Sequence, residues 1–129
     1  MLTSGQIAFF ETFGYVVLRK LFSPDEMDTF TREANEIREE VLGQPPETTG
    51  RGKVEPFFER RPFLNSLLDD DRIYGIAEDL LGEDFVLDET EGNWHVGDTK
   101  WHGSAHWDVI RWIKIGFYLE PLTRDTGCL

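Results

Sequence analysis

The 129-residue sequence predicts an α+β protein in which the helices come first and a sheet follows them. Before Gly82, apolar residues recur every three or four positions, which is the spacing of one helical face. After Gly82, apolar and polar residues alternate, as in strands with one buried face. The sequence shows no internal repeat and no linker, so we expect residues 1–129 to form a single domain.

Three helices are predicted from their ends as well as their periodicity. The first is capped by the hydroxyl of Thr3 or Ser4 and ends at Gly14. The second begins at "SPDE", residues 23–26, where a capping box precedes an apolar stripe that runs to Gly43. That stripe consists of Met27, Phe30, Ala34, Ile37 and Val41. An aspartate of the 69–71 run caps the third, which ends at Gly82.

Strands are expected at residues 15–18, 85–87, 93–96 and 113–120. In the last of these, apolar residues from Ile113 to Leu119 share one face, and Lys114 and Tyr118 share the other. Residues 43–53 are rich in Gly, Pro, Thr and Glu, which predicts a solvated loop.

The net charge of −12 argues against nucleic acid and membrane surfaces as partners, because both carry negative charge. The only cysteine, Cys128, forms no internal disulfide, so a reducing cytoplasm is the expected location. The N-terminal stretch has neither a basic region nor an uninterrupted apolar run, and we expect no signal peptide. Nothing in the sequence indicates an oligomeric state.

The stretch "KWHGSAHWDV", residues 100–109, contains the candidate metal ligands. His106 and Asp108 are one residue apart, so in a strand they share a face with Cα atoms roughly 6.6 Å apart. Two histidines and one carboxylate are the ligand set of non-haem Fe(II) oxygenases, and this pair supplies two of the three. The stretch is rich in tryptophan, and the candidate walls of a dry pocket are Trp101, Trp107 and Trp112.

The segments "GNWHVGDTKWH" and "IKIGFYLEPLTRDTGCL" resemble the phytanoyl-CoA dioxygenase family of Fe(II)- and 2-oxoglutarate-dependent oxygenases, as does the opening "GYVVL" followed by "LFSPDEM". The resemblance implies a double-stranded β-helix, a cupin-like jelly roll, with the N-terminal helices packed on its first strands. It also implies Fe(II) as cofactor, 2-oxoglutarate as cosubstrate, and O₂ and a small organic molecule as substrates of a hydroxylation.

The family's third iron ligand is a histidine much further along the chain, with a 2-oxoglutarate-binding arginine beyond it. No histidine follows Asp108 here, and Arg124 does not match that arginine. The resemblance therefore implies an N-terminal portion of the jelly roll, incomplete and inactive by itself.

Two registers of the stretch compete under this resemblance. In one, His102 binds iron and Ser104 takes the carboxylate position, as a small residue does in related halogenases. In the other, His106 and Asp108 bind iron, which keeps both ligand types and is the register we favour. In an extended chain His102 and His106 lie roughly 13 Å apart, so one ion cannot bind both unless the chain folds back at Gly103. A non-catalytic binding or structural jelly roll is the alternative of a different class, and His95 is expected to point outward or to line a pocket.

Overall fold

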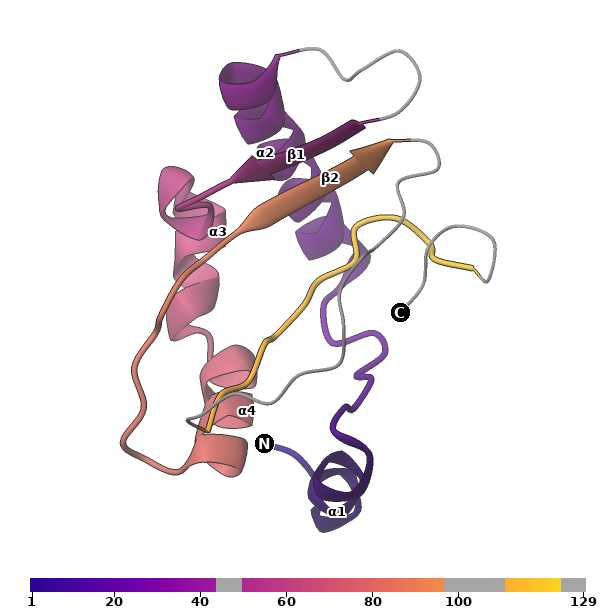
Figure 1. Ribbon diagram of the computed structural model, residues 1–129, viewed down its shortest axis with the longest axis vertical. Coiled ribbons are helices and arrows are strands. Elements are labelled where there is room, and N and C mark those ends of the chain that lie inside the picture. The colour runs from indigo at the N-terminus through magenta and orange to yellow at the C-terminus, as the bar shows by residue number, and fades with distance from the viewer. Residues whose placement is uncertain (44–49, 97–110, 124–129) are drawn as a thin grey trace.

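The computed structural model describes residues 1–43, 50–96 and 111–123 of the chain. Within them it shows four α-helices and a two-stranded antiparallel sheet (Figure 1), which confirms the α+β class. The predicted order of helices before sheet is wrong in one respect, because one strand precedes the last two α-helices. The elements follow the order α1 (Ser4–Phe13), α2 (Pro24–Leu42), β1 (Gly50–Val54), η1 (Phe58–Arg60), α3 (Pro62–Ser66), η2 (Leu67–Asp69), α4 (Asp71–Leu81) and β2 (Gly92–Val96). The short helices η1, α3 and η2 carry no periodic signal of their own and were not predicted.

Side-chain caps begin the three predicted helices where the sequence places them. Thr3, rather than Ser4, accepts a hydrogen bond from the Gln6 backbone N–H, and the Gln6 side chain accepts one from the Thr3 backbone N–H. Ser23 and Glu26 form the same reciprocal pair at the start of α2. Asp70 caps α4 by accepting from the N–H of Arg72. Because each cap involves residues no more than three positions apart, local sequence was enough to predict it.

The core lies between α2 and the chain from β1 to η2. The α2 stripe is buried at Phe30, Ala34 and Ile37, whereas Val41, near the end of the helix, is exposed. These residues pack with apolar side chains of the segment that follows, which are Val54, Phe57, Phe58, Leu64 and Leu67. The second helix therefore buries its face as predicted, except at its last turn.

Strand β1 pairs with β2 in an antiparallel register that runs from Gly50 opposite Val96 to Val54 opposite Gly92. The prediction of a loop over residues 43–53 is therefore wrong for residues 50–53. The reason is that two of the five β1 residues are glycine, which has low strand propensity. In β2, Gly92 is required by packing, because a Cβ there would lie 2.7 Å from the buried Phe57 ring. A Cβ on Gly52 would meet the partly exposed Leu42 side chain, which has room to move.

Three of the four predicted strands are absent from the described secondary structure. Residues 15–18, 85–87 and 113–120 have strand-like composition, but the structure assigns none of them to a strand. Val86, for example, is 88% exposed. A strand requires a partner for its backbone N–H and C=O groups, and β1 and β2 pair with each other. Burial still alternates from Ile113 to Glu120, so the predicted faces of that segment are correct although its strand is not.

An arginine joins α4 to the start of α2. The Arg72 guanidinium lies 2.7 Å from a Glu26 carboxylate oxygen and 2.6 Å from an Asp70 oxygen, and it donates to the Leu21 carbonyl. Hydrogen bonding from Arg72 is the main reason why the pKa of Glu26 falls to about 2. The capping glutamate of α2 is therefore also the anchor of α4.

We expect Leu64→Ala to lower the free energy of unfolding by about 2–5 kcal/mol, because the Leu64 side chain is fully buried and its loss leaves a cavity. Leu87→Ala is the matched control, since Leu87 is 59% exposed, and it should change stability by less than about 0.5 kcal/mol. Urea unfolding followed by tryptophan fluorescence measures both. Equal losses in the two variants would contradict the assignment of Leu64 to the core.

Candidate functional site

The predicted iron ligands His106 and Asp108, and the alternative pair His102 and Ser104, lie outside the described residues, as do Trp101 and Trp107. The structure does describe the chain on either side of them. Strand β2 leads into residues 97–110, and residues 111–119 follow them. We call β2 and residues 111–119 the flanking segments, and their contacts define how the candidate stretch is supported.

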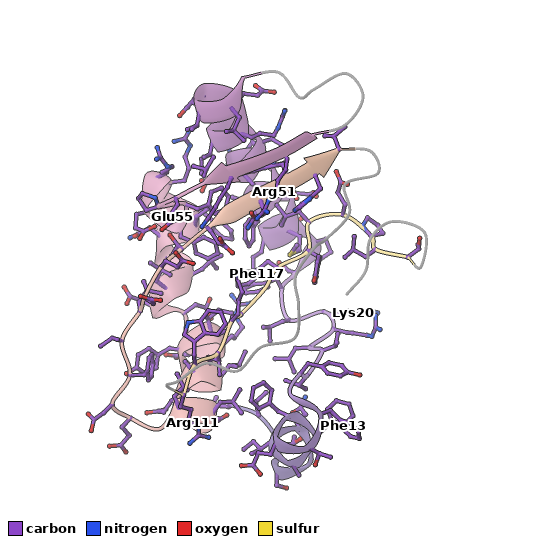
Figure 2. All side chains as sticks on the ribbon, viewed as in Figure 1. Phe13, Lys20, Arg51, Glu55, Arg111 and Phe117 are labelled. Atoms are coloured by element: carbon purple, nitrogen blue, oxygen red, sulfur yellow. The ribbon has the colours of Figure 1, made fainter. Side chains whose placement is uncertain are left out.

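Aromatic contacts anchor both flanking segments to one core. In β2, the Trp94 ring lies edge-on to Phe57, with centroids 5.6 Å apart. In the other segment, the Phe117 ring lies 5.2 Å from Phe30 and 5.6 Å from Phe58. Figure 2 shows Phe117 near the centre of the molecule, where its segment crosses the helices. The chain therefore enters and leaves the candidate stretch from fixed positions on the same aromatic cluster.

A carboxylate joins the flanking segments on the side away from that cluster. Glu91 directly precedes β2, and one of its oxygens lies 2.9 Å from the ammonium of Lys53 in β1. Its other oxygen accepts a hydrogen bond from the ammonium of Lys114. We call these three residues the Glu91 clasp. The Glu91 side chain is only 13% exposed, so this carboxylate is largely removed from water while it holds two lysines.

The ion pairs of the clasp shift the pKa values of its own residues and of two nearby glutamates. Hydrogen bonds from Lys114 and then Lys53 overcome the effect of burial and lower the pKa of Glu91 to about 2. Lys53 also lies 2.7 Å from Glu55, and hydrogen bonding to Glu55 and Glu91 raises its pKa above the ordinary lysine value. Glu55 shares a hydrogen bond with Glu89, which raises the pKa of Glu89, while the pKa of Glu55 is lowered, chiefly by Lys53.

The outward face of the β1–β2 ribbon is polar and basic. Arg51 and Lys53 alternate with glycines along β1, and Asn93 and His95 occupy the same face of β2. His95 lies opposite Arg51 in the register, as expected for an outward strand residue. The Arg51 guanidinium donates to the Asn93 amide oxygen at 3.5 Å. Since Lys53 is paired with Glu55 and Glu91, this face is polar rather than strongly positive.

Trp112 is the one predicted pocket wall that the structure describes, and its indole is 42% exposed. A depression of about 370 Å³ lies elsewhere, between α1, residues 17–21 and α4. None of the predicted site residues lines it, and its Arg72 guanidinium is engaged by Glu26 and Asp70. Within residues 1–43, 50–96 and 111–123, no three His, Cys, Asp or Glu side chains are grouped so that they could hold a metal ion.

Comparisons of the chain with family models, with curated proteins and with solved structures return no match. The resemblance to the phytanoyl-CoA dioxygenase family therefore stays a prediction from the sequence. In the part of the chain that the structure describes, no helix is both long enough and apolar enough to cross a membrane.

Sequence reasoning missed the Glu91 clasp. Lys53, Glu91 and Lys114 each look like ordinary surface charges, and nothing in their spacing links positions 38 and 23 residues apart. The one sequence feature that could have pointed to the clasp was Lys114, because it lies on the polar face of an alternating segment beside the candidate site. Its partner became evident only when β1 and β2 were placed.

Phe117→Ala should destabilise the protein by about 1–3 kcal/mol, since the ring is partly buried against Phe30 and Phe58. Tyr118→Ala removes the neighbouring ring on the exposed side and should cost less than about 0.5 kcal/mol. Chemical denaturation gives both values. If Tyr118→Ala lowered the free energy of unfolding as much as Phe117→Ala, the assignment of buried and exposed faces in residues 113–119 would be wrong.

The Glu91 clasp should contribute stability that depends on pH. Because the pKa of Glu91 is lowered from 4.5 to about 2, its contribution is complete above pH 4.5 and is lost as the pH falls toward 2. We therefore expect Glu91→Gln to be less stable than the unmutated chain at pH 6 and the difference to shrink at pH 2.5. Urea unfolding at both values tests this, with Glu83→Gln as the control. A difference of the same size at both pH values would contradict the pairing.

Proposed function

We propose that the protein is an Fe(II)- and 2-oxoglutarate-dependent dioxygenase that hydroxylates a small organic substrate. The observation that carries the proposal is the sequence His106–Trp107–Asp108, placed between two flanking segments that are anchored to one aromatic core. A metal site of this kind needs ligands on a rigid support, because small displacements of a ligand weaken both binding and catalysis.

The residue types of the stretch suit Fe(II). Imidazole nitrogen and carboxylate oxygen are the donors of the two-histidine, one-carboxylate arrangement, which leaves coordination positions open. His106 and Asp108 would hold the metal, with His102 beside Ser104 as the alternative pair. A second histidine is required, and the resemblance implies that it lies much further along the chain than Asp108.

Bound Fe(II) would supply the oxidation of a substrate C–H bond to C–OH by O₂, coupled to the conversion of 2-oxoglutarate to succinate and CO₂. The protein's own contribution is to hold the ligands and to exclude water. Trp107, between the two ligands, and Trp101 are the residues we assign to the pocket wall, together with Trp112.

A jelly roll is the fold we propose for the complete domain. Two features support it: the antiparallel β1–β2 ribbon, with α2 packed behind it in Figure 1, and the alternating burial of residues 113–120. Alternation of this kind suits a further strand once a neighbouring strand satisfies its backbone.

Anaerobic titration with Fe(II) and 2-oxoglutarate tests the metal site. For the polypeptide read from the coding sequence through its distal histidine, we expect a weak visible metal-to-ligand charge-transfer band. Asp108→Ala should abolish the band, because it removes the carboxylate ligand, and Ser104→Ala should leave it unchanged.

A band that survives Asp108→Ala but is lost in His102→Ala would assign the site to His102 with Ser104 and favour a halogenase-like protein. Absence of the band in the unmutated protein would contradict the proposal. A coding sequence with neither a histidine nor an arginine at the expected distance beyond Leu129 would also contradict it and favour a non-catalytic jelly roll.

A further inference from the structure

The two flanking segments are held together by two kinds of contact on opposite sides. On the inner side, Trp94 and Phe117 reach the same aromatic cluster through Phe57 and Phe58. Apolar packing of this kind is tolerant of small shifts, since it has little directional preference. On the outer side, the Glu91 clasp joins the segments through charge-assisted hydrogen bonds, whose short distances and directions restrict geometry more closely.

The backbone around Glu91 is anchored independently of the clasp. The neighbouring residue, Thr90, is buried, and its hydroxyl oxygen accepts hydrogen bonds from the backbone N–H groups of Phe57 at 2.9 Å and Phe58 at 3.2 Å. The same hydroxyl donates to the carboxylate of Glu59. Glu91 therefore projects from a fixed point on the core, and a lysine that binds it takes up a defined position relative to that core.

Lys114 links the other flanking segment, residues 111–119, to Glu91. It follows residues 97–110 by only four positions, and the side chains beside it, Ile113 and Ile115, are partly buried. Because Glu91 and Lys114 are 23 residues apart in sequence, their ion pair limits how far apart the two ends of the intervening chain can lie. The candidate iron ligands lie within that interval.

We propose that Glu91 is a positioning residue whose ion pairs to Lys53 and Lys114 set the separation of the chain segments that lead into and out of the candidate iron-binding stretch. The inference rests on the proposed function, because it assigns the clasp a role in holding the ligands His106 and Asp108. A carboxylate with this burial and two cationic partners contributes more to geometry than an exposed surface pair, which is usually weak.

Two measurements test the Glu91 clasp and the proposed metal site independently of each other. The first is hydrogen exchange of the metal-free protein, in which Glu91→Gln should make peptides covering residues 92–96 and 113–119 exchange roughly fivefold faster. Lys114→Met removes one of the two lysine partners at an exposed position and should likewise speed the exchange of the peptide covering residues 113–119. Glu83→Gln, which removes a carboxylate outside the clasp, should not change the exchange of these peptides.

The second measurement is anaerobic calorimetric titration with Fe(II) alone, on the same polypeptide as in the charge-transfer experiment. Glu91→Gln and Lys114→Met should each raise the Fe(II) dissociation constant about tenfold, as the loss of residues that orient metal ligands typically does. The double variant should be no weaker than Glu91→Gln alone, because Glu91→Gln already removes the ion pair to Lys114 together with the one to Lys53.

If hydrogen exchange were unchanged in both Glu91→Gln and Lys114→Met, the claim that the Glu91 clasp holds the flanking segments would be overturned. Faster exchange with unchanged Fe(II) affinity would overturn its positioning role, as would additive effects in the double variant. If the unmutated protein bound no Fe(II), the proposed function would fail and the positioning role with it, while the exchange data would still decide whether the clasp exists.

Discussion

Contact among Phe30, Phe58 and Phe117 is the interaction on which the rest of the structure depends. The three rings come from α2, η1 and the segment after the candidate site, and their centroids lie 5.2–5.7 Å apart. Phe57 extends the cluster to Trp94 in β2. Buried aromatic rings remove a large apolar area from water, which is why a small cluster can hold together segments so distant in sequence.

The consequence for function is that one core supports both ends of the candidate iron-binding stretch. Aromatic packing brings β2 and residues 111–119 to the same place, and the Glu91 clasp then joins them on the opposite side through Lys114. The two contributions differ in kind. Apolar packing is the dominant source of folding free energy but has little directional preference, whereas the ion pairs restrict the relative orientation of the two segments. This division suits a site whose ligands must be held accurately by a small domain.

The chemistry proposed for the candidate site rests on the sequence alone and stays a prediction, since residue type limits which metals a donor set suits. His106 and Asp108 are identifiable from their spacing, and Trp107 lies between them. The support of the site was not predictable. Thr90 and Glu91 have no distinguishing sequence signal, and their partners lie more than 20 positions away, in η1, β1 and the segment after the site.

The sequence by itself determined the three long helices, the capping box of Ser23 and Glu26, and the alternating faces of residues 113–120. Each of these depends on groups within a few positions of one another. Tertiary structure decided which segments became strands. Residues 50–54 pair with β2 despite their glycines, and residues 15–18 do not form a strand despite their β-branched side chains. The physical reason is that a strand is completed by a partner across space, and close packing against the buried Phe57 ring favours glycine at position 92.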